Sequence, residues 1–389
     1  MKISIKTITP LHIWTWKKIT PFEYVVEDDN FLRINYKKLY KLLEEKKRKN
    51  LQEALNSSSL LYARYYVNLY FSNLSDNTKD KLIIYKIDVS EQFKSIYNIK
   101  IQDKKKHNEA NRLEVDEAIK NFDWFYIPWS SLKWCIRTIV LYDIAKNTKD
   151  PELNTFFNQF NDIKNLEDNQ KKNIQIRIRS RSDTNSKIEC SLLNYQKVWQ
   201  DPFRFLIIRD SNVVGFENWI VEKNYRLWQK GKLHTTKEYI KSETFFTVEI
   251  KVNNKLFNLS KEKLNINWNI DFSDEKEFLN YVKQISDDFY KERFELIKKF
   301  TEEQLVTLKS KEQNRWTKAE IQMYKKLLQN IDDLQNQLYS LKDNEFLLNL
   351  GFGWGYWFKK LDDLLQPKTY NFVWNEMLNG FIKLTFTEW

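Results

Sequence analysis

The chain has 389 residues, of which 42% are hydrophobic and 30% are charged, and its formal net charge is +11. That length is sufficient for two domains, and the surplus of Lys and Arg favours a polyanionic partner, nucleic acid before membrane. Two cysteines cannot build a disulfide scaffold, no apolar run is long enough to span a membrane, and the N-terminus lacks the apolar core of a signal peptide. We therefore expect a cytoplasmic protein with reduced thiols.

The first half of the chain alternates between strand-like and helix-like patterns. Ile3 and Ile5 fall on one face of an alternating segment that Pro10 ends, which predicts a half-buried strand. Leucines at helical spacing predict the next element, a helix with a basic end. The expected elements are a strand over 2–8, helices over 33–49 and 51–72, a strand over 81–89 and a helix over 127–146.

The second half adds strands and one long polar region. Strands are predicted over 174–181, 204–209, 244–252 and 381–386. Residues 274–345 contain neither Gly nor Pro and carry an interrupted helical stripe, which predicts a helical insertion or hairpin. Strands at both ends of each half, with helices between, predict an α+β fold of two modules with antiparallel sheets, residues 1–203 and 204–389. A ferredoxin-like or RRM-like unit satisfies that pattern.

A glycine-rich segment near the C-terminus is the clearest motif. Gly351, Gly353 and Gly355 are three of only six glycines. Without a Cβ, the backbone N–H groups at such positions can meet a phosphate directly, and Lys359 beyond them suits phosphate contact. The segment is not a P-loop, because no Gly-Lys-Ser/Thr follows at the required spacing. A tight structural turn is the alternative.

The segment from Thr9 to Lys18 contains His12, one of three histidines. A histidine after a strand can act as a general acid or base, although a core or hydrogen-bonding histidine is the commoner outcome. No Cys/His cluster has zinc spacing and no serine nucleophile elbow is present. We therefore expect neither a metal nor a cofactor.

Residues 127–137, IPWSSLKWCIR, combine a helix start with hydroxyls and cations. Ser130 or Ser131 is expected to cap the helix, and a helix N-terminus attracts anions. Lys133 and Arg137 lie four residues apart and share one helix face, which suits a phosphate chain. The alternative is an ordinary capped helix with a solvated face.

Three arginines alternate along the strand expected at 174–181. Arg177, Arg179 and Arg181 would project from one face about 7 Å apart, near the spacing of successive backbone phosphates. Paired charges on a solvated sheet are the alternative.

Four segments taken in order resemble one family. TPLHI at 9–13, IPWSSLKWCIRT at 127–138, RFLIIRDS at 204–211 and LGFGWGYWFKK at 350–360 look like motifs of the RAMP superfamily of CRISPR proteins. The stretch PFEYVVEDDNFLRIN at 21–35 is similar to the Csm subunit five family of type III-A effector complexes. Each motif alone is weak, but four in order are fairly specific, and they span most of the chain outside the helical insertion.

The resemblance implies two ferredoxin-like RAMP domains and a non-catalytic, RNA-binding subunit that caps a Csm complex at the 3′ part of the guide RNA (crRNA). It also implies contacts with other Csm subunits, above all the backbone RAMP subunit, and a role in antiviral defence. Guide-RNA maturation would be supported by recruiting a host nuclease. With the arginine stripe added, the RNA-facing residues are predicted to be His12, Trp14, Trp16, Lys17, Lys18, Ser130, Ser131, Lys133, Arg137, Arg177, Arg179, Arg181, Gly351, Gly353, Gly355 and Lys359.

Tryptophan stands in this chain where the family usually has glycine. The positions are Trp14, Trp16, Trp129 and Trp134, with Trp354 as a further case. Such an exchange removes positive-φ freedom from a tight loop and adds a large ring. Because UGA is read as glycine in some bacterial lineages and as tryptophan in others, we hypothesise a decoding artefact. It would explain six glycines and fourteen tryptophans together; genuine tryptophans would instead suggest base stacking.

Three rival functions stay open. A RAMP-type endoribonuclease would use His12 as general acid or base and Lys133 or Arg137 to stabilise charge. A sister RAMP subunit of another type III complex would share the fold and the RNA. An unrelated basic α+β protein would show no salt-sensitive RNA binding.

Overall fold

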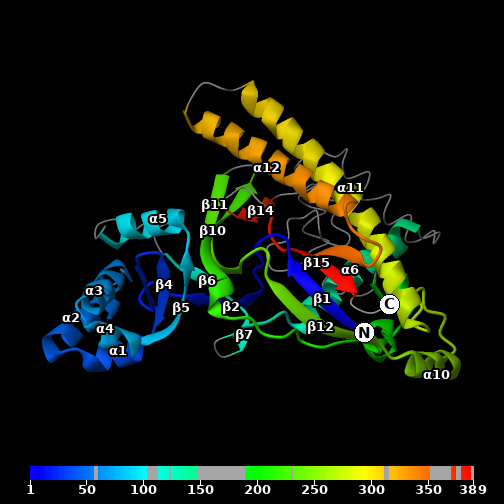
Figure 1. The fold of residues 1–389 in the computed structure, drawn as a ribbon, viewed down its shortest axis with the longest axis horizontal. Helices are drawn as coiled ribbons and strands as arrows, with labels where there is room; N and C mark the ends of the chain where they lie inside the picture. The colour runs from blue at the N-terminus through cyan, green and yellow to red at the C-terminus, as the bar shows by residue number, and fades with distance from the viewer. Residues whose placement is uncertain are drawn as a thin grey trace.

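Two large β-sheets form the centre of the molecule, and helices pack around them (Figure 1). The computed structural model describes residues 1–56, 60–102, 113–121, 124–147, 189–228, 231–310, 315–350, 369–373 and 378–386. None of the helices in these ranges combines the length and the apolar character that a membrane crossing requires.

The first sheet has five strands, in the order β13-β15-β1-β12-β9, and every pairing is antiparallel. Its strands are β1 (Lys2–Thr7), β9 (Leu206–Ile208), β12 (Phe245–Val252), β13 (Glu345–Asn349) and β15 (Phe381–Phe386). Ile3 and Ile5 are fully buried, as the alternation predicted. The predicted strands over 2–8, 204–209, 244–252 and 381–386 are confirmed to within two residues at each end.

The second sheet has eight strands, and seven of them run in the order β2-β6-β11-β10-β5-β4-β3. They are β2 (Trp14–Ile19), β3 (Tyr24–Glu27), β4 (Asn30–Ile34), β5 (Ile83–Val89), β6 (Val115–Ala118), β10 (Trp219–Trp228) and β11 (Gly231–Ile240), with β14 (Thr369–Val373) paired to β10. A small separate pair is formed by β7 (Lys120–Asn121) and β8 (Trp124–Phe125).

This second sheet is mixed, since β10 pairs with β5, and β11 with β6, in parallel. The expectation of purely antiparallel sheets was therefore wrong here. The long β10–β11 hairpin was also missed. Its strands bury polar residues, among them Asn224, Lys237 and Glu238, so the sequence lacks the apolar alternation that marks a strand with one solvated face.

The helices are α1 (Tyr36–Leu42), α2 (Glu45–Asn56), α3 (Leu60–Ser72), α4 (Asp76–Asp80), α5 (Glu91–Gln102), α6 (Trp129–Asn147), α10 (Asn254–Leu264), α11 (Glu275–Lys309) and α12 (Arg315–Tyr339). Short 3-10 turns lie at Val198–Gln200, Pro202–Phe205 and Phe216–Asn218. Of the predicted helices, the one over 127–146 is confirmed by α6, and the helical insertion over 274–345 is confirmed as the α11–α12 hairpin.

The helix predicted over 33–49 was wrong at its start and in its continuity. Residues up to Ile34 belong to β4, and the Asn35 side chain accepts a hydrogen bond from the backbone N–H of Lys38 at 3.0 Å, which starts α1. Leu43 has an extended backbone (ψ 145°) and ends that helix. Of the helix predicted over 51–72, residues 51–56 belong to α2 and residues 60–72 form α3.

Two hydrophobic clusters support this arrangement. The larger one joins the first sheet, α6 and α11, and includes residues from both halves of the chain. The smaller one packs α1 to α3 against the far end of the second sheet, around Leu39, Leu51 and Phe71. Because β1 pairs with β12 and β15, strands on either side of residues 203 and 204 share one sheet. The fold class is α+β; the two-domain division and the ferredoxin-like assignment stay predictions.

Candidate nucleic-acid interface

The segment that follows β1 crosses from one sheet to the other and is tied to the C-terminal part of the chain. Leu11 exchanges backbone hydrogen bonds with Ile240 at 2.8 and 2.9 Å. The hydroxyl of Thr9 accepts a hydrogen bond from the N–H of Phe381 at 2.9 Å. Residues 9–13 are therefore held in place before the exposed strand β2 begins.

Gly380 makes the closest of these contacts possible. Its N–H donates to Pro10 O at 2.9 Å, and its own carbonyl accepts from Leu350 N–H at 2.7 Å. Its φ is +84°, and a Cβ at this position would lie 2.0 Å from Leu350 O. Sequence reasoning did not single this residue out, although the Asn379-Gly380 pair just before a predicted strand is a turn signal that could have found it.

His12 lies inside this junction and is 2% exposed. Its Nδ1 lies 2.7 Å from Glu238 O, and because a carbonyl only accepts, Nδ1 carries the proton. Burial, together with the nearby Lys237 and Lys120, holds the pKa of His12 well below its ordinary value. The ring is therefore neutral near pH 7, and its Nε2 has no hydrogen-bond partner within the described part of the chain.

Glu238, whose carbonyl orients His12, is fully buried in a polar network. Its carboxylate accepts from Tyr85 Oη at 2.5 Å, from Lys120 Nζ at 2.8 Å and from the N–H of Ala118 at 2.9 Å. This network joins β5, β6 and β11 beneath the histidine. Neither Glu238 nor Tyr85 was predicted, because only the fold brings these residues together.

The second motif, α6, begins against the third motif, RFLIIRDS. The N–H of Trp129 donates to Asp210 Oδ1 at 2.8 Å, and the N–H of Ile127 donates to Ser211 Oγ at 2.8 Å. The carboxylate of Asp210, and not the predicted Ser130 or Ser131, thus meets the first helical N–H. Ser130 is exposed at the same helix end.

The two cations predicted on α6 are already engaged within the chain. Arg137 forms ion pairs with Asp201 at 2.7 Å and with Glu189 at 3.1 Å. Lys133 Nζ donates to Leu206 O at 2.8 Å, and burial lowers the pKa of Lys133. Their geometry fits a helix anchored to the segment at 189–206, so the face that they share is not the solvated face of the alternative.

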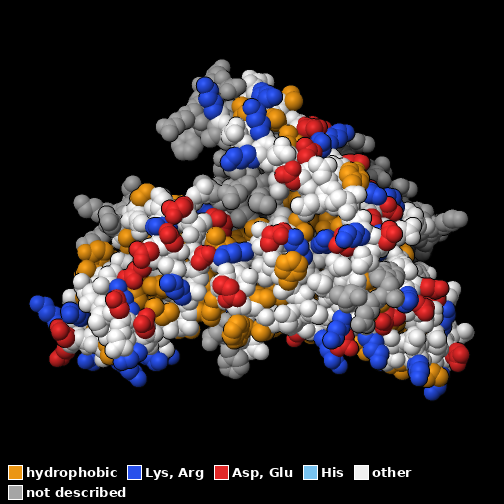
Figure 2. All heavy atoms as spheres, viewed as in Figure 1, with side chains coloured by type: hydrophobic (Ala, Val, Ile, Leu, Met, Phe, Trp, Pro, Cys, Tyr) orange, Lys and Arg blue, Asp and Glu red, His pale blue; other side chains and the backbone are white. Residues whose placement is uncertain are grey.

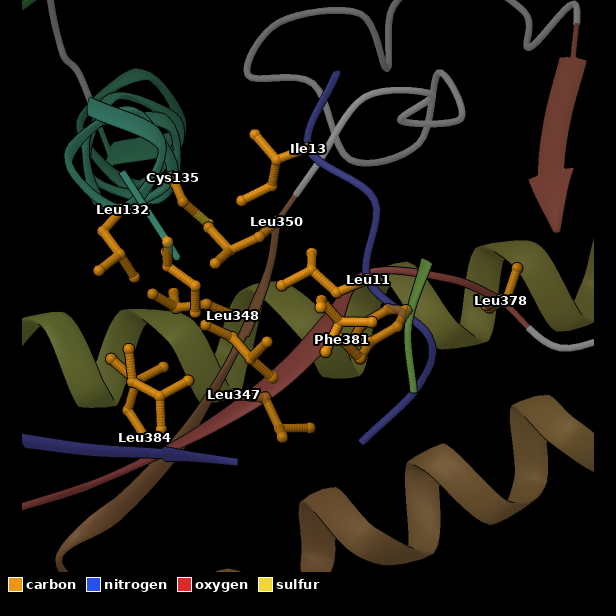
Figure 3. Packing of buried hydrophobic residues seen from close by; sticks show 14 of the residues in the cluster. Leu11, Ile13, Leu132, Cys135, Leu347, Leu348, Leu350, Leu378, Phe381 and Leu384 are labelled. Carbon is orange, nitrogen blue, oxygen red and sulfur yellow. The ribbon is translucent and has the colours of Figure 1, made fainter. Parts of the chain in front are cut away.

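One core brings the motifs together. Figure 3 shows Leu11 and Ile13 from the N-terminal segment, Leu132 and Cys135 from α6, and Leu350 from the end of β13 around one hydrophobic centre. Cys135 Sγ donates to Asn349 O at 3.1 Å, and burial raises the pKa of Cys135 to about 12. The thiol is therefore a structural group. Leu350, the last described residue before the glycine-rich segment, packs in the same cluster as Leu11 and Ile13.

The tryptophans of the motifs differ from the core tryptophans. Trp16 is 74% exposed, and Trp129 and Trp134 are about half exposed, whereas Trp219 and Trp268 are buried. Trp16 has φ 68°, a backbone conformation that favours glycine. The Trp14 and Trp16 ring centroids lie 4.4 Å apart on strand β2, with the ring planes tilted by 39°. The pairing of β2 with β6 is irregular between Trp14 and Lys18. Lys17 is exposed, and Lys18 pairs with Glu114 at 2.7 Å.

Several predicted residues lie outside the described ranges. They are Arg177, Arg179 and Arg181, with their strand at 174–181, and Gly351, Gly353, Gly355, Trp354 and Lys359. Within the described ranges, no group of three or more His, Cys, Asp or Glu side chains could hold a metal ion.

Two curated proteins that share one description are similar to this chain. No protein-family model matches. The chain is 26% identical over 393 residues to a protein of Methanocaldococcus jannaschii described as CRISPR system Cms protein Csm5, covering 99% of this chain and 78% of that protein. It is 29% identical over 170 residues to the Streptococcus thermophilus protein of the same description, covering 42% and 44%.

Two solved structures share the fold. A crystal structure of T. onnurineus Csm5 superposes with a TM-score of 0.62 at 17% identity, covering 97% of this chain and 99% of that one. A chain in a cryo-EM structure of a Csm–crRNA–target RNA ternary complex of a type III-A system also gives 0.62, at 18% identity, covering 99% and 100%.

Proposed function

Because the chain belongs to the Csm5 family of CRISPR proteins, we propose that it is a subunit of a type III-A effector complex and binds its guide RNA. The observation that carries the proposal is the match to a Csm5 protein over 99% of the chain. The convergence of the separate motifs on one core supports it, since surface loops that share a core can act as one binding surface.

We further propose that the chain caps the complex at the 3′ part of the guide RNA, beside the backbone subunit. The RNA-facing residues would be Lys17, Lys18 and Ser130, which are exposed members of the motifs. Residues 14 and 16 would join them, as would the glycine-rich segment, which lies outside the described ranges. Arg137 and Lys133 would position α6 from within the fold. Such a role implies a cytoplasmic location and a part in antiviral defence.

The chain is proposed to bind without cutting and to support maturation by recruiting a nuclease. A neutral, buried His12 cannot donate a proton as an imidazolium, so the described geometry does not favour it as a general acid. Its Nδ1 is occupied by Glu238 O, and its Nε2 faces the protein interior. The endoribonuclease alternative therefore needs a rearrangement that exposes Nε2.

Reconstitution tests the proposal directly. Co-expression with the other Csm subunits and a guide RNA is expected to yield one complex that contains this chain, and crosslinking should map it to the 3′ part of the guide. A complex that assembles fully without this chain, or crosslinks at the 5′ end, would contradict the proposal. Metal-independent cleavage of repeat RNA by the pure protein, lost in His12→Gln, would favour the endoribonuclease instead.

A further inference from the structure

A strongly basic surface lies at the opposite end of the molecule from α10. It is formed by Lys37, Lys38 and Lys41 of α1 and by Lys46, Lys47, Arg48 and Lys49 of α2, and is called here the α1–α2 basic surface. Only Glu44 and Glu45 interrupt it, so residues 37–49 carry a charge of +5, against +11 for all 389 residues. Figure 2 shows Lys and Arg side chains gathered at this end of the molecule.

These cations are exposed and largely unpaired. All seven are exposed, and their one ion pair with a described residue joins Lys47 to Glu44 at 3.6 Å. Neighbouring cations behave differently: Arg33 pairs with Glu23 at 2.9 Å, and Lys79 pairs with Glu27 at 3.0 Å. Arg48 Nε donates to Leu43 O at 2.7 Å. The chain thus neutralises cations nearby but leaves most of this set free to meet an external anion.

The arrangement works against the stability of the helices that carry it. Lys46, Lys47 and Arg48 occupy the first turn of α2, where the helix dipole disfavours cations. Lys37 and Lys41 are four residues apart on α1, a spacing at which like charges repel. Residues that oppose local stability are expected where function requires them.

The backbone beneath these side chains is firmly held. Leu39, Leu43, Leu51 and Ala54 are buried and direct the apolar faces of both helices inward. Leu42 alone among the apolar residues of α1 and α2 stays largely exposed, at 57%. Because almost no apolar side chain is left to enter a bilayer, a membrane surface fits this region less well than a hydrated polyanion.

We propose that the α1–α2 basic surface binds the phosphodiester backbone of RNA, without reading its sequence, as a contact additional to the exposed motif residues Lys17, Lys18 and Ser130. The proposal rests on the proposed function for the identity of the polyanion. Lysine ammonium groups meet phosphates as mobile point charges, and each contact releases counterions, so the contribution should depend strongly on salt.

The test is a charge-removal variant of the full chain, with Lys41, Lys46, Lys47 and Lys49 all changed to Gln. Its matched control changes Lys251, Lys255, Lys263 and Lys309 to Gln, four exposed lysines elsewhere that have no ion pair among the described contacts. Affinity for a fluorescent single-stranded RNA is measured by anisotropy over a range of salt concentrations, and melting temperatures verify that both variants fold.

In the α1–α2 variant, the slope of log affinity against log salt is expected to become shallower by up to about 3, at about 0.7 for each lost phosphate contact on a single strand. The control should keep the wild-type slope. Equal slopes for the two variants would overturn the inference and leave the proposed function intact. Absence of RNA binding by the wild-type chain would instead contradict the proposed function. An unchanged RNA slope combined with loss of a partner subunit would overturn the inference in favour of an acidic protein surface.

Discussion

The motif on α6 and the α1–α2 basic surface use the same residue types in opposite ways. Arg137 and Lys133 are held by Asp201, Glu189 and Leu206 inside the fold, whereas the seven cations of α1 and α2 are exposed with one ion pair between them and the described residues. The difference shows that a cation in a recognisable motif can serve architecture, while a cation outside any motif can be the one available to a ligand. Whether a cation is held within the fold depends on its ion-pair and hydrogen-bond partners, and these come from distant parts of the chain.

The largest effect on stability is expected at Arg137. Changing Arg137→Met leaves Asp201 and Glu189 without their cation in a largely buried setting, which should lower the free energy of unfolding by about 3 kcal/mol. The matched change Lys46→Met, in the exposed set, should alter it by less than about 0.5 kcal/mol. Urea unfolding measures both, and equal losses would abolish the distinction between the two surfaces.

The second-largest loss of stability is expected for Gly380→Ala. A methyl group at this position would lie 2.0 Å from Leu350 O, and the residue has φ +84°, so the turn must shift or strain. We expect a loss of at least about 2 kcal/mol, together with weaker RNA binding because the turn joins residues 10 and 350. Gly215→Ala is a suitable control, since Gly215 has φ −76° and the side chain of Glu217 can move away. Equal stability of the two variants would contradict this reading.

His12 should make the fold sensitive to acid. Its pKa is lowered in the folded state, so the unfolded chain takes up a proton first as pH falls below about 6.5, and stability is then lost. The contribution is fully present above that pH and declines by up to about 1.4 kcal/mol per pH unit below it. Unfolding measured between pH 5 and pH 8 should show a shallower pH dependence in His12→Gln. A steeper slope in that variant would show that His12 is charged in the fold.

The smallest expected change is a gain at position 16. Trp16→Gly removes an exposed ring and a left-handed backbone strain, which should stabilise the protein by about 1 kcal/mol. Trp219→Gly, at a buried position, should strongly destabilise it. Reading the codons at positions 14, 16, 129 and 134 tests the decoding hypothesis independently. UGG at these positions would exclude it, and Trp16→Gly should then weaken RNA binding through lost stacking.

Local sequence patterns were sufficient to predict an element where the burial of one apolar face decided its structure. The alternation in KISIKTI predicts β1, and the glycine-free periodic stretch predicts the α11–α12 hairpin, because each buries one continuous apolar face. Patterning failed at β10 and β11, where polar residues such as Asn224, Lys237 and Glu238 are buried and the Glu238 carboxylate accepts hydrogen bonds from Tyr85 and Lys120. It also failed at residues 33–35, where Asn35 starts a helix directly after a strand.

The sequence by itself determined the α+β class, the basic character and the resemblance to one family, since composition, short-range periodicity and ordered motifs are local properties. Only the tertiary structure decided which charged residues are free. Asp210 reaches the start of α6 from 81 residues away, Asp201 neutralises Arg137 from 64 residues away, and Glu238 orients His12 from 226 residues away. Such partners lie far apart along the chain and become neighbours when the shared core is buried.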